Sequence, residues 1–170
     1  MPDLREQLQQ CLRGRVCLMG LGNEDYGDDG AGIRLAEELM GAGLPDVMIA
    51  GSRPETCISR AGGEGFANIV FLDAVEFGGA PGSVVLLDSG EMAARFPQIS
   101  THKISLSVLA MWAEAGGTTK AWLLGVQPES LKPGRQLSAA VQTTLAVLKE
   151  LLQELNPAQD SKLFADGKAC

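Results

Sequence analysis

The chain has 170 residues, including 14 Lys or Arg and 21 Asp or Glu, so its formal net charge is −7 and its isoelectric point is about 4.7. A chain of this length forms one domain that buries roughly two thirds of its unfolded surface, so it needs no disulfide or structural metal to fold. The acidic balance, without a basic stripe, excludes nucleic acid and anionic membrane surfaces as partners. The first residues lack the basic start and apolar core of a signal peptide, and no run reaches the roughly 18 apolar residues of a membrane span, so we expect a cytoplasmic protein.

The N-terminal residues predict a helix and then a strand. Within residues 1–14, apolar side chains recur at the i, i+4, i+7 and i+8 positions of an amphipathic helix that packs on the domain, namely Leu4, Leu8, Cys11 and Leu12. Residues 15–19 (RVCLM) form a short apolar run that is typical of a central strand.

A glycine-spaced acidic loop, residues 20–32 (GLGNEDYGDDGAG), separates this strand from the next helix. Its glycines allow tight backbone turns at the end of a sheet. Its acidic residues create a local negative field that attracts cations and repels phosphates, and they are Glu24, Asp25, Asp28 and Asp29. The position and charge of the loop indicate a site rather than a linker.

Helical and strand-like patterns then alternate. Apolar residues between 33 and 40 define the buried face of a helix, and residues 47–50 form a second strand. The motif Ser52-Arg53-Pro54-Glu55 fits a capping box at the start of another helix. Residues 68–73 (NIVFLD) are apolar on both faces, as in a buried parallel strand, and they end on Asp73.

The second half of the chain completes an α/β pattern. The connection 74–82 is too short for a crossover helix, so we expect the strand at 83–87 to be antiparallel to its neighbours. A helix between 106 and 113, a strand at 121–126 and a closing helix between 141 and 152 follow. We therefore predict one three-layer α/β/α domain over residues 1–155, with an about five-stranded, mostly parallel sheet containing one antiparallel strand, and a polar, flexible tail at 156–170.

Acidic residues at two strand ends and the only histidine are candidates for a metal site. In open α/β sheets, ligands bind beyond the carboxyl ends of the parallel strands. Asp28 and Asp29 follow the first strand and Asp73 ends the third, so their carboxylates can converge and then require a proton or a cation. Together with His102 they offer a mixed nitrogen and oxygen set that suits Ni²⁺ or Zn²⁺.

Each of these residues also has a structural interpretation. Asp28 or Asp29 can cap the helix that follows and interact with its dipole. Asp73 can be a structural residue at a strand end, and His102 can cap a helix or lie on the surface. The functional interpretation depends on their joint occurrence.

Other classes of site lack the residues that they need. The sequence Gly20-Leu21-Gly22 opens like a dinucleotide-binding fingerprint, but Asp25 stands where the third glycine is required and would repel a pyrophosphate. The triplet at 88–90 (DSG) is more typical of a turn than of an aspartic protease. The chain has no GxSxG elbow and no HExxH motif, and its four cysteines form no CxxC pair.

Five motifs, in order and spacing, resemble those of the hydrogenase maturation endopeptidases. They are GxGN followed by DDGxG, a strand that ends in Asp73-Ala74, Pro81-Gly82, Thr101-His102, and residues 124–129 (LGVQPE). The resemblance covers about residues 15–152. Residues 51–55 (GSRPE) resemble the branch that processes membrane-bound, hydrogen-evolving hydrogenases.

The resemblance implies an endopeptidase that removes a C-terminal extension from the precursor of a NiFe hydrogenase large subunit once nickel is inserted. The nickel carried by this substrate would be the recognition element, cadmium or zinc can replace it in the site, and no organic cofactor is implied. By motif, the metal-contacting and catalytic residues are Asp29, Asp73 and His102, with Asp28 as a supporting or capping residue. Where family members carry Glu, Asp29 is one methylene shorter, so the metal distance or substrate preference can differ.

A metal-polarised carbonyl or a metal-bound water would make peptide hydrolysis feasible near neutral pH, with either carboxylate as the general base. The backbone amides of Gly22 and Asn23 are candidates for binding the extended substrate or an oxyanion. The same ligands would also serve a non-catalytic nickel chaperone of hydrogenase assembly, which is the alternative function.

Overall fold

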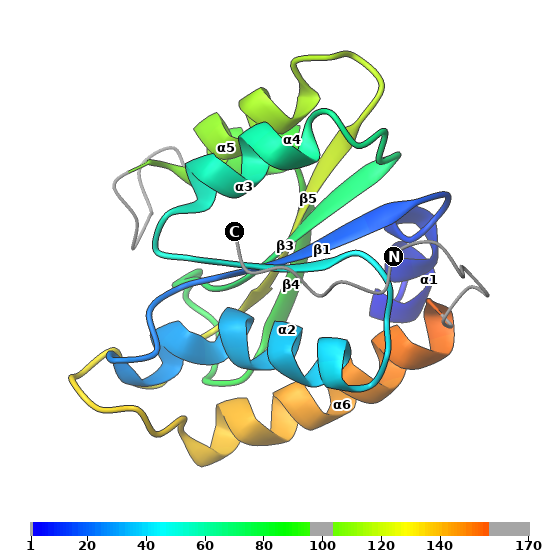
Figure 1. The fold of residues 1–170 in the computed structure, drawn as a ribbon. Coiled ribbons are helices and arrows are strands. Elements are labelled where there is room, and N and C mark those ends of the chain that lie inside the picture. Colours follow the sequence, from blue (N-terminus) through cyan, green and yellow to red (C-terminus); the bar gives the residue numbers. More distant parts are fainter. Residues whose placement is uncertain (1, 96–103, 157–170) are drawn as a thin grey trace.

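The computed structural model describes residues 2–95 and 104–156, which form a three-layer α/β/α arrangement (Figure 1). The five strands of the sheet follow the order β2-β1-β3-β5-β4. They are β1 (Val16–Leu21), β2 (Val47–Gly51), β3 (Asn68–Ala74), β4 (Val84–Asp88) and β5 (Lys120–Val126). The pairs β1·β2, β1·β3 and β3·β5 are parallel, and β4 pairs antiparallel with β5. The predicted fold class is confirmed, including the antiparallel strand after the short connection.

Helices cover both faces of the sheet (Figure 1). One face carries α1 (Leu4–Cys11), α2 (Ala31–Gly41) and α6 (Ala139–Leu155). The other carries α3 (Pro54–Ala61), α4 (Ser89–Arg95) and α5 (Leu106–Glu114). Successive residues of β3 point to opposite faces, so Val70 and Leu72 join the first core, and Ile69 and Phe71 join the second. Two covered faces explain why residues 69–72 of this strand are all apolar.

Helix α1 connects the first residues to the last described helix. Leu8 and Cys11 are buried, and the Arg5 guanidinium donates to the Glu154 carboxylate at 2.7 and 3.0 Å. Among residues 2–95 and 104–156, no helix combines the length and apolar character needed to cross a membrane. The polar tail predicted at 156–170 lies outside the described residues from 157 onward, and so does His102.

Two local predictions at helix starts were wrong. The capping box expected at Ser52 does not form, because α3 begins with Pro54 and no side chain caps it. A reciprocal capping pair opens α4 instead: the Glu91 amide donates to the Asp88 carboxylate at 2.8 Å, and the Asp88 amide donates to the Glu91 carboxylate at 3.1 Å. The segment at 88–90, predicted as a turn, therefore begins a helix.

Helix α2 approaches the sheet closely where β1 and β3 end. A side-chain carbon at Gly32 would overlap the Leu72 carbonyl oxygen and lie 2.6 Å from the Leu21 carbonyl oxygen. At Gly20 it would lie 2.7 Å from the Ala36 Cβ. The absence of side chains at these two positions lets the start of α2 rest directly on the strand ends.

Candidate active site

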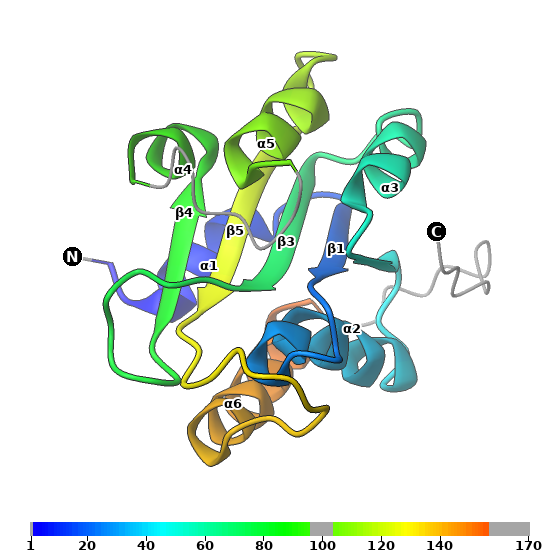
Figure 2. The same ribbon diagram turned by 90° about the vertical axis from the view of Figure 1, so that its left-hand side faces the viewer.

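Asp29 and Asp73 lie at the carboxyl end of the sheet, which Figure 2 shows facing the viewer. Asp73 is the penultimate residue of β3, and Asp29 belongs to the 3₁₀ turn η1 (Gly27–Gly30), between β1 and α2. Both are buried, with 6% of Asp29 and 3% of Asp73 exposed. Strands β1 and β3 are parallel neighbours, with Gly20 opposite Leu72, as expected from the sequence.

Gly22 lies between the two acidic residues. Its φ of 124° is unfavourable for residues with side chains, and a Cβ there would overlap the Asp29 carbonyl oxygen and lie 3.8 Å from Oδ1 of Asp73. The next amide, of Asn23, donates to Oδ2 of Asp29 at 3.1 Å. The fold thus places both Asp29 and Asp73 close to the backbone of Gly22.

The amides of residues 22 and 23 are already used within the protein. Gly22 donates to the Gly51 carbonyl of β2 at 3.1 Å, and Asn23 donates to both the carbonyl and the carboxylate of Asp29. This geometry disagrees with the expectation that these amides bind the substrate or an oxyanion. Asn23 instead orients the Asp29 carboxylate.

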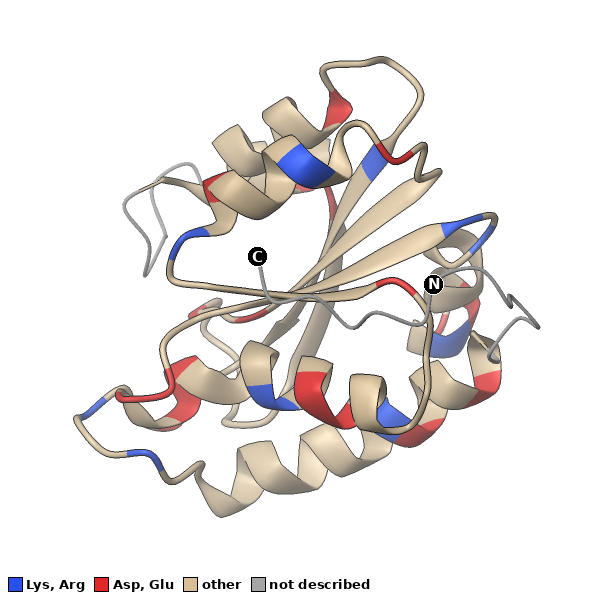
Figure 3. Cartoon of the chain, viewed as in Figure 1, with Lys and Arg blue, Asp and Glu red and all other residues tan. Residues whose placement is uncertain are grey.

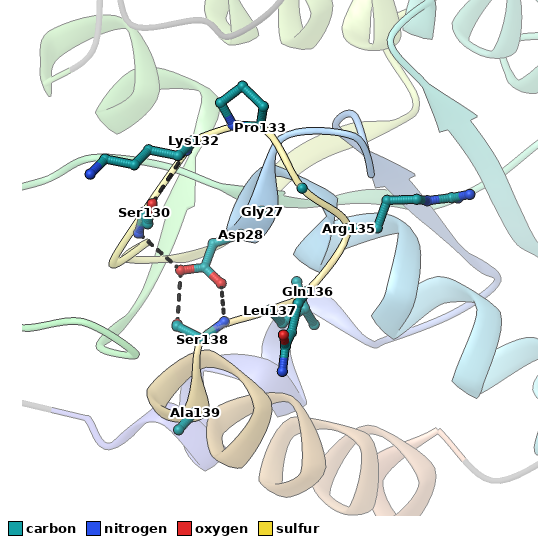
Figure 4. Close-up of a pocket in the computed structure, with 11 residues that line it drawn as sticks. Gly27, Asp28, Ser130, Lys132, Pro133, Arg135, Gln136, Leu137, Ser138 and Ala139 are labelled. Carbon is teal, nitrogen blue, oxygen red and sulfur yellow. Dashed lines mark hydrogen bonds between the residues drawn. The ribbon is translucent and has the colours of Figure 1, made fainter.

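Asp28, although adjacent to Asp29, faces a different part of the chain. Its carboxylate accepts four hydrogen bonds. Figure 4 shows three of them, from the Ser130 amide at 3.2 Å, the Ser138 amide at 2.7 Å and the Ser138 hydroxyl at 2.8 Å. The fourth comes from the Glu129 amide at 2.8 Å. Burial alone would raise the pKa of Asp28, but these hydrogen bonds outweigh it and lower the pKa below the usual value of a carboxyl. Asp28 therefore holds the segment that leads into α6, and it does not cap α2, which has no side-chain cap.

A pocket of about 630 Å³ adjoins Asp28 on this side (Figure 4). Its wall consists mainly of residues 130 and 132–139, which belong to the segment between β5 and the start of α6. Neither Asp29 nor Asp73 lines it. The pocket is therefore separate from the acidic pair.

Basic residues neutralise much of the charge on the first half of the acidic loop. Glu24 forms ion pairs with Arg34 and Arg135, both at 3.1 Å, and Asp25 lies 3.6 Å from Arg135. Figure 3 shows acidic and basic segments side by side at this end of the molecule. The negative charge expected over the whole loop is thus partly balanced at Glu24 and Asp25.

Gln127 is a buried polar residue beside the site, and the sequence motif gave it no role. It is 8% exposed, and its Oε1 accepts hydrogen bonds from the amides of Phe77 at 2.9 Å and Gly79 at 3.2 Å, in the loop that follows β3. Its position directly after the buried strand β5 could have indicated this role from the sequence, because a buried polar side chain needs hydrogen-bond partners.

The donor set near Asp29 and Asp73 suits a divalent cation in part. Within the described ranges, no three His, Cys, Asp or Glu side chains are close enough together to hold a metal ion. The two buried carboxylates would supply the oxygen ligands of a mixed oxygen and nitrogen set. The predicted nitrogen ligand, His102, is outside these ranges.

The chain belongs to the hydrogenase maturation protease family, whose family model, named HycI, matches residues 33–154. Asp73 lies within the matched range and Asp29 shortly before it. A related protein is the Hydrogenase 3 maturation protease of Escherichia coli K12, which is 32% identical over 116 residues, or 66% of this chain and 72% of that protein.

Solved structures show the same fold. The NiFe hydrogenase maturation protease HycI from Thermococcus kodakarensis superimposes with a TM-score of 0.78 and 28% identity, covering 88% of this chain and 97% of the other. The endopeptidase HycI from Escherichia coli superimposes with a TM-score of 0.71 and 25% identity, covering 81% and 88%.

Proposed function

We propose that this chain is an endopeptidase that removes the C-terminal extension of a NiFe hydrogenase large-subunit precursor after nickel insertion. The observation that carries the proposal is the pair of buried carboxylates, Asp29 and Asp73, in a chain of the hydrogenase maturation protease family. They come from separate elements and meet at the carboxyl ends of adjacent parallel strands, where this class of fold binds its ligands.

The chemistry of the pair favours a metal-assisted cleavage. Two adjacent carboxylates are stabilised by a cation, and nickel accepts oxygen and imidazole ligands, so Asp29, Asp73 and His102 would engage the nickel that the substrate presents. The metal would polarise the scissile carbonyl or a water molecule, and one carboxylate would remove a proton from that water. Cadmium or zinc would occupy the same ligands, which makes them useful probes.

The test is to incubate the protein with nickel-loaded and nickel-free precursor and to measure the intact mass of the precursor. We expect the nickel-loaded form alone to lose its extension. Asp29→Ala, Asp73→Ala and His102→Ala should each abolish cleavage, and Asp25→Ala, which changes an exposed acid of the same loop, should not. If all three variants retain activity, the proposed site is wrong.

The same experiment separates the protease from a nickel chaperone. A chaperone would bind the metal through the same carboxylates and leave the mass of the precursor unchanged. Wild-type protein that binds Ni²⁺ without shortening any nickel-loaded precursor would therefore favour the chaperone.

A further inference from the structure

We propose that residues 127–130, directly after β5, form a brace that positions both carboxylates of the active site, with Gln127 and Asp28 as its positioning residues. The proposal rests on the proposed function and adds to it the question of what holds Asp29 and Asp73 in place. Three of its four residues, 127–129, belong to the LGVQPE motif, which supplies none of the proposed metal ligands.

On one side, the brace holds the loop that follows Asp73. Gln127 makes four hydrogen bonds with this loop: its side-chain oxygen accepts from Phe77 and Gly79, its carbonyl accepts from Gly82 at 2.8 Å, and its amide donates to Ser83 at 2.8 Å. The strand register places this contact directly after the Asp73↔Gly125 and Ala74↔Val126 pairs. The chain that leaves Asp73 is therefore fixed within a few residues of the carboxylate.

On the other side, the brace holds the turn that carries Asp29. Glu129 and Ser130 donate their amides to the Asp28 carboxylate, and the Asp28 amide donates back to the Ser130 carbonyl at 3.0 Å. Asp28 and Asp29 are consecutive in η1, so a shift of Asp28 moves the backbone of Asp29 as well.

Residues 127–130 thus contact both the loop that follows Asp73 and the turn that carries Asp29. In this way the brace sets the distance between the two carboxylates. This geometry predicts an effect on the rate of the chemical step rather than on substrate affinity. A displacement of about 1 Å in a catalytic group can reduce a rate by about 100-fold.

The experiment uses the full chain and compares four variants. Gln127→Leu removes the acceptor for Phe77 and Gly79, whereas Gln127→Glu keeps an oxygen in that position. Asp28→Asn places an amide group against the donors of residues 129–138. Asp88→Asn is the matched control, because Asp88 also accepts a hydrogen bond from a helix amide but belongs to β4 and the start of α4.

We expect Gln127→Leu and Asp28→Asn to lower kcat for the nickel-loaded precursor by about 10- to 100-fold, with KM changed by less than about threefold. Gln127→Glu and Asp88→Asn should stay within about threefold of the wild type in kcat. Binding of Cd²⁺ alone, measured by calorimetry, should weaken in Gln127→Leu and recover in Gln127→Glu. Circular dichroism confirms that each variant is folded at the assay temperature.

A purely structural role would lower the melting temperature and leave kcat of the folded protein unchanged. Folded Gln127→Leu and Asp28→Asn with wild-type kcat and Cd²⁺ affinity would therefore overturn the brace and leave the proposed function standing. Wild-type protein that neither cleaves the precursor nor binds Cd²⁺ would overturn the proposed function, and the brace with it.

Discussion

Two consecutive aspartates of this chain have opposite environments. In a 3₁₀ turn, successive residues are rotated by about one third of a circle, so neighbouring side chains face different surroundings. Asp28 meets the amides of Glu129, Ser130 and Ser138, while Asp29 meets Asn23 on the side of Asp73. The Asp28 carboxylate therefore secures the loop, and the Asp29 carboxylate lies at the candidate site.

The lowered pKa of Asp28 makes the stability of the protein depend on pH in the acid range. Since the carboxyl ionises more readily in the folded than in the unfolded chain, its contribution is complete above the usual pKa of 3.8 and is lost as the pH falls towards the folded value. We expect Asp28→Asn to lower the free energy of unfolding at pH 7 by about 2–4 kcal/mol and to reduce its decline below pH 4.

Urea denaturation between pH 2.5 and 7, followed by circular dichroism, measures this dependence. Asp25→Asn serves as the control, since Asp25 is exposed and its carboxylate forms a surface ion pair with Arg135. If the free energy of unfolding of Asp28→Asn falls with pH as steeply as that of the wild type, the acid sensitivity arises from other carboxyls.

The sequence allowed the role of Asp28 to be predicted only in part. A capping or supporting role follows from an aspartate placed next to a helix, but the helix it supports is α6, whose N-cap residue, Ser138, lies 110 residues later. Hydrogen bonds between such distant segments leave no periodic pattern. Gln127 was not predicted for the same reason, because its partners Phe77 and Gly79 belong to an irregular loop.

At the scale of elements, the contact of α2 with the strand ends places the site. Gly32 and Gly20 let the helix approach the strand ends closely, and η1, which directly precedes the helix, contacts β3. Strands and long helices were predictable because their apolar periods are regular. Helix α4 was missed because the Ser89-Gly90 pair is typical of a turn, and its start depends on the reciprocal bonds of Asp88 and Glu91.

A pair of substitutions within α2 tests this close contact. Gly32→Ala should lower the free energy of unfolding by about 1–3 kcal/mol, because the new methyl group would overlap the backbone of Leu72. Gly41→Ala, at the end of the same helix, meets no atom within 4 Å and should raise it by up to about 1 kcal/mol.

Urea unfolding of both variants, with the wild type in parallel, shows whether each substitution raises or lowers the free energy of unfolding. Equal effects of the two substitutions would show that helix propensity, and not the contact with the sheet, determines the result.

For the whole molecule, one sheet supplies both hydrophobic cores. Leu18 packs in the core under α1, α2 and α6, and its neighbours Cys17 and Met19 pack in the core under α3 to α5. Since the same strands contribute to both cores, the loss of either helix layer would expose one apolar face of the sheet. We expect the two layers to unfold together.

The two tryptophans report on this cooperativity, because Trp112 belongs to α5 and Trp122 to β5, next to the other core. Trp112→Phe and Trp122→Phe each leave one fluorescent reporter. In each variant, the fluorescence transition in urea should coincide with the transition in far-ultraviolet circular dichroism. A separate, earlier transition for either reporter would mean that its layer unfolds alone.

The hydrogen bonds between Asp28 and Ser138 also bear on how the protein is made. They join residues 110 positions apart, and closing a loop of that length carries an entropic cost that only the finished fold repays. During synthesis, the turn that carries Asp28 leaves the ribosome about 100 residues before its partners at 129–138. A nascent chain therefore cannot complete these hydrogen bonds until that later segment has emerged.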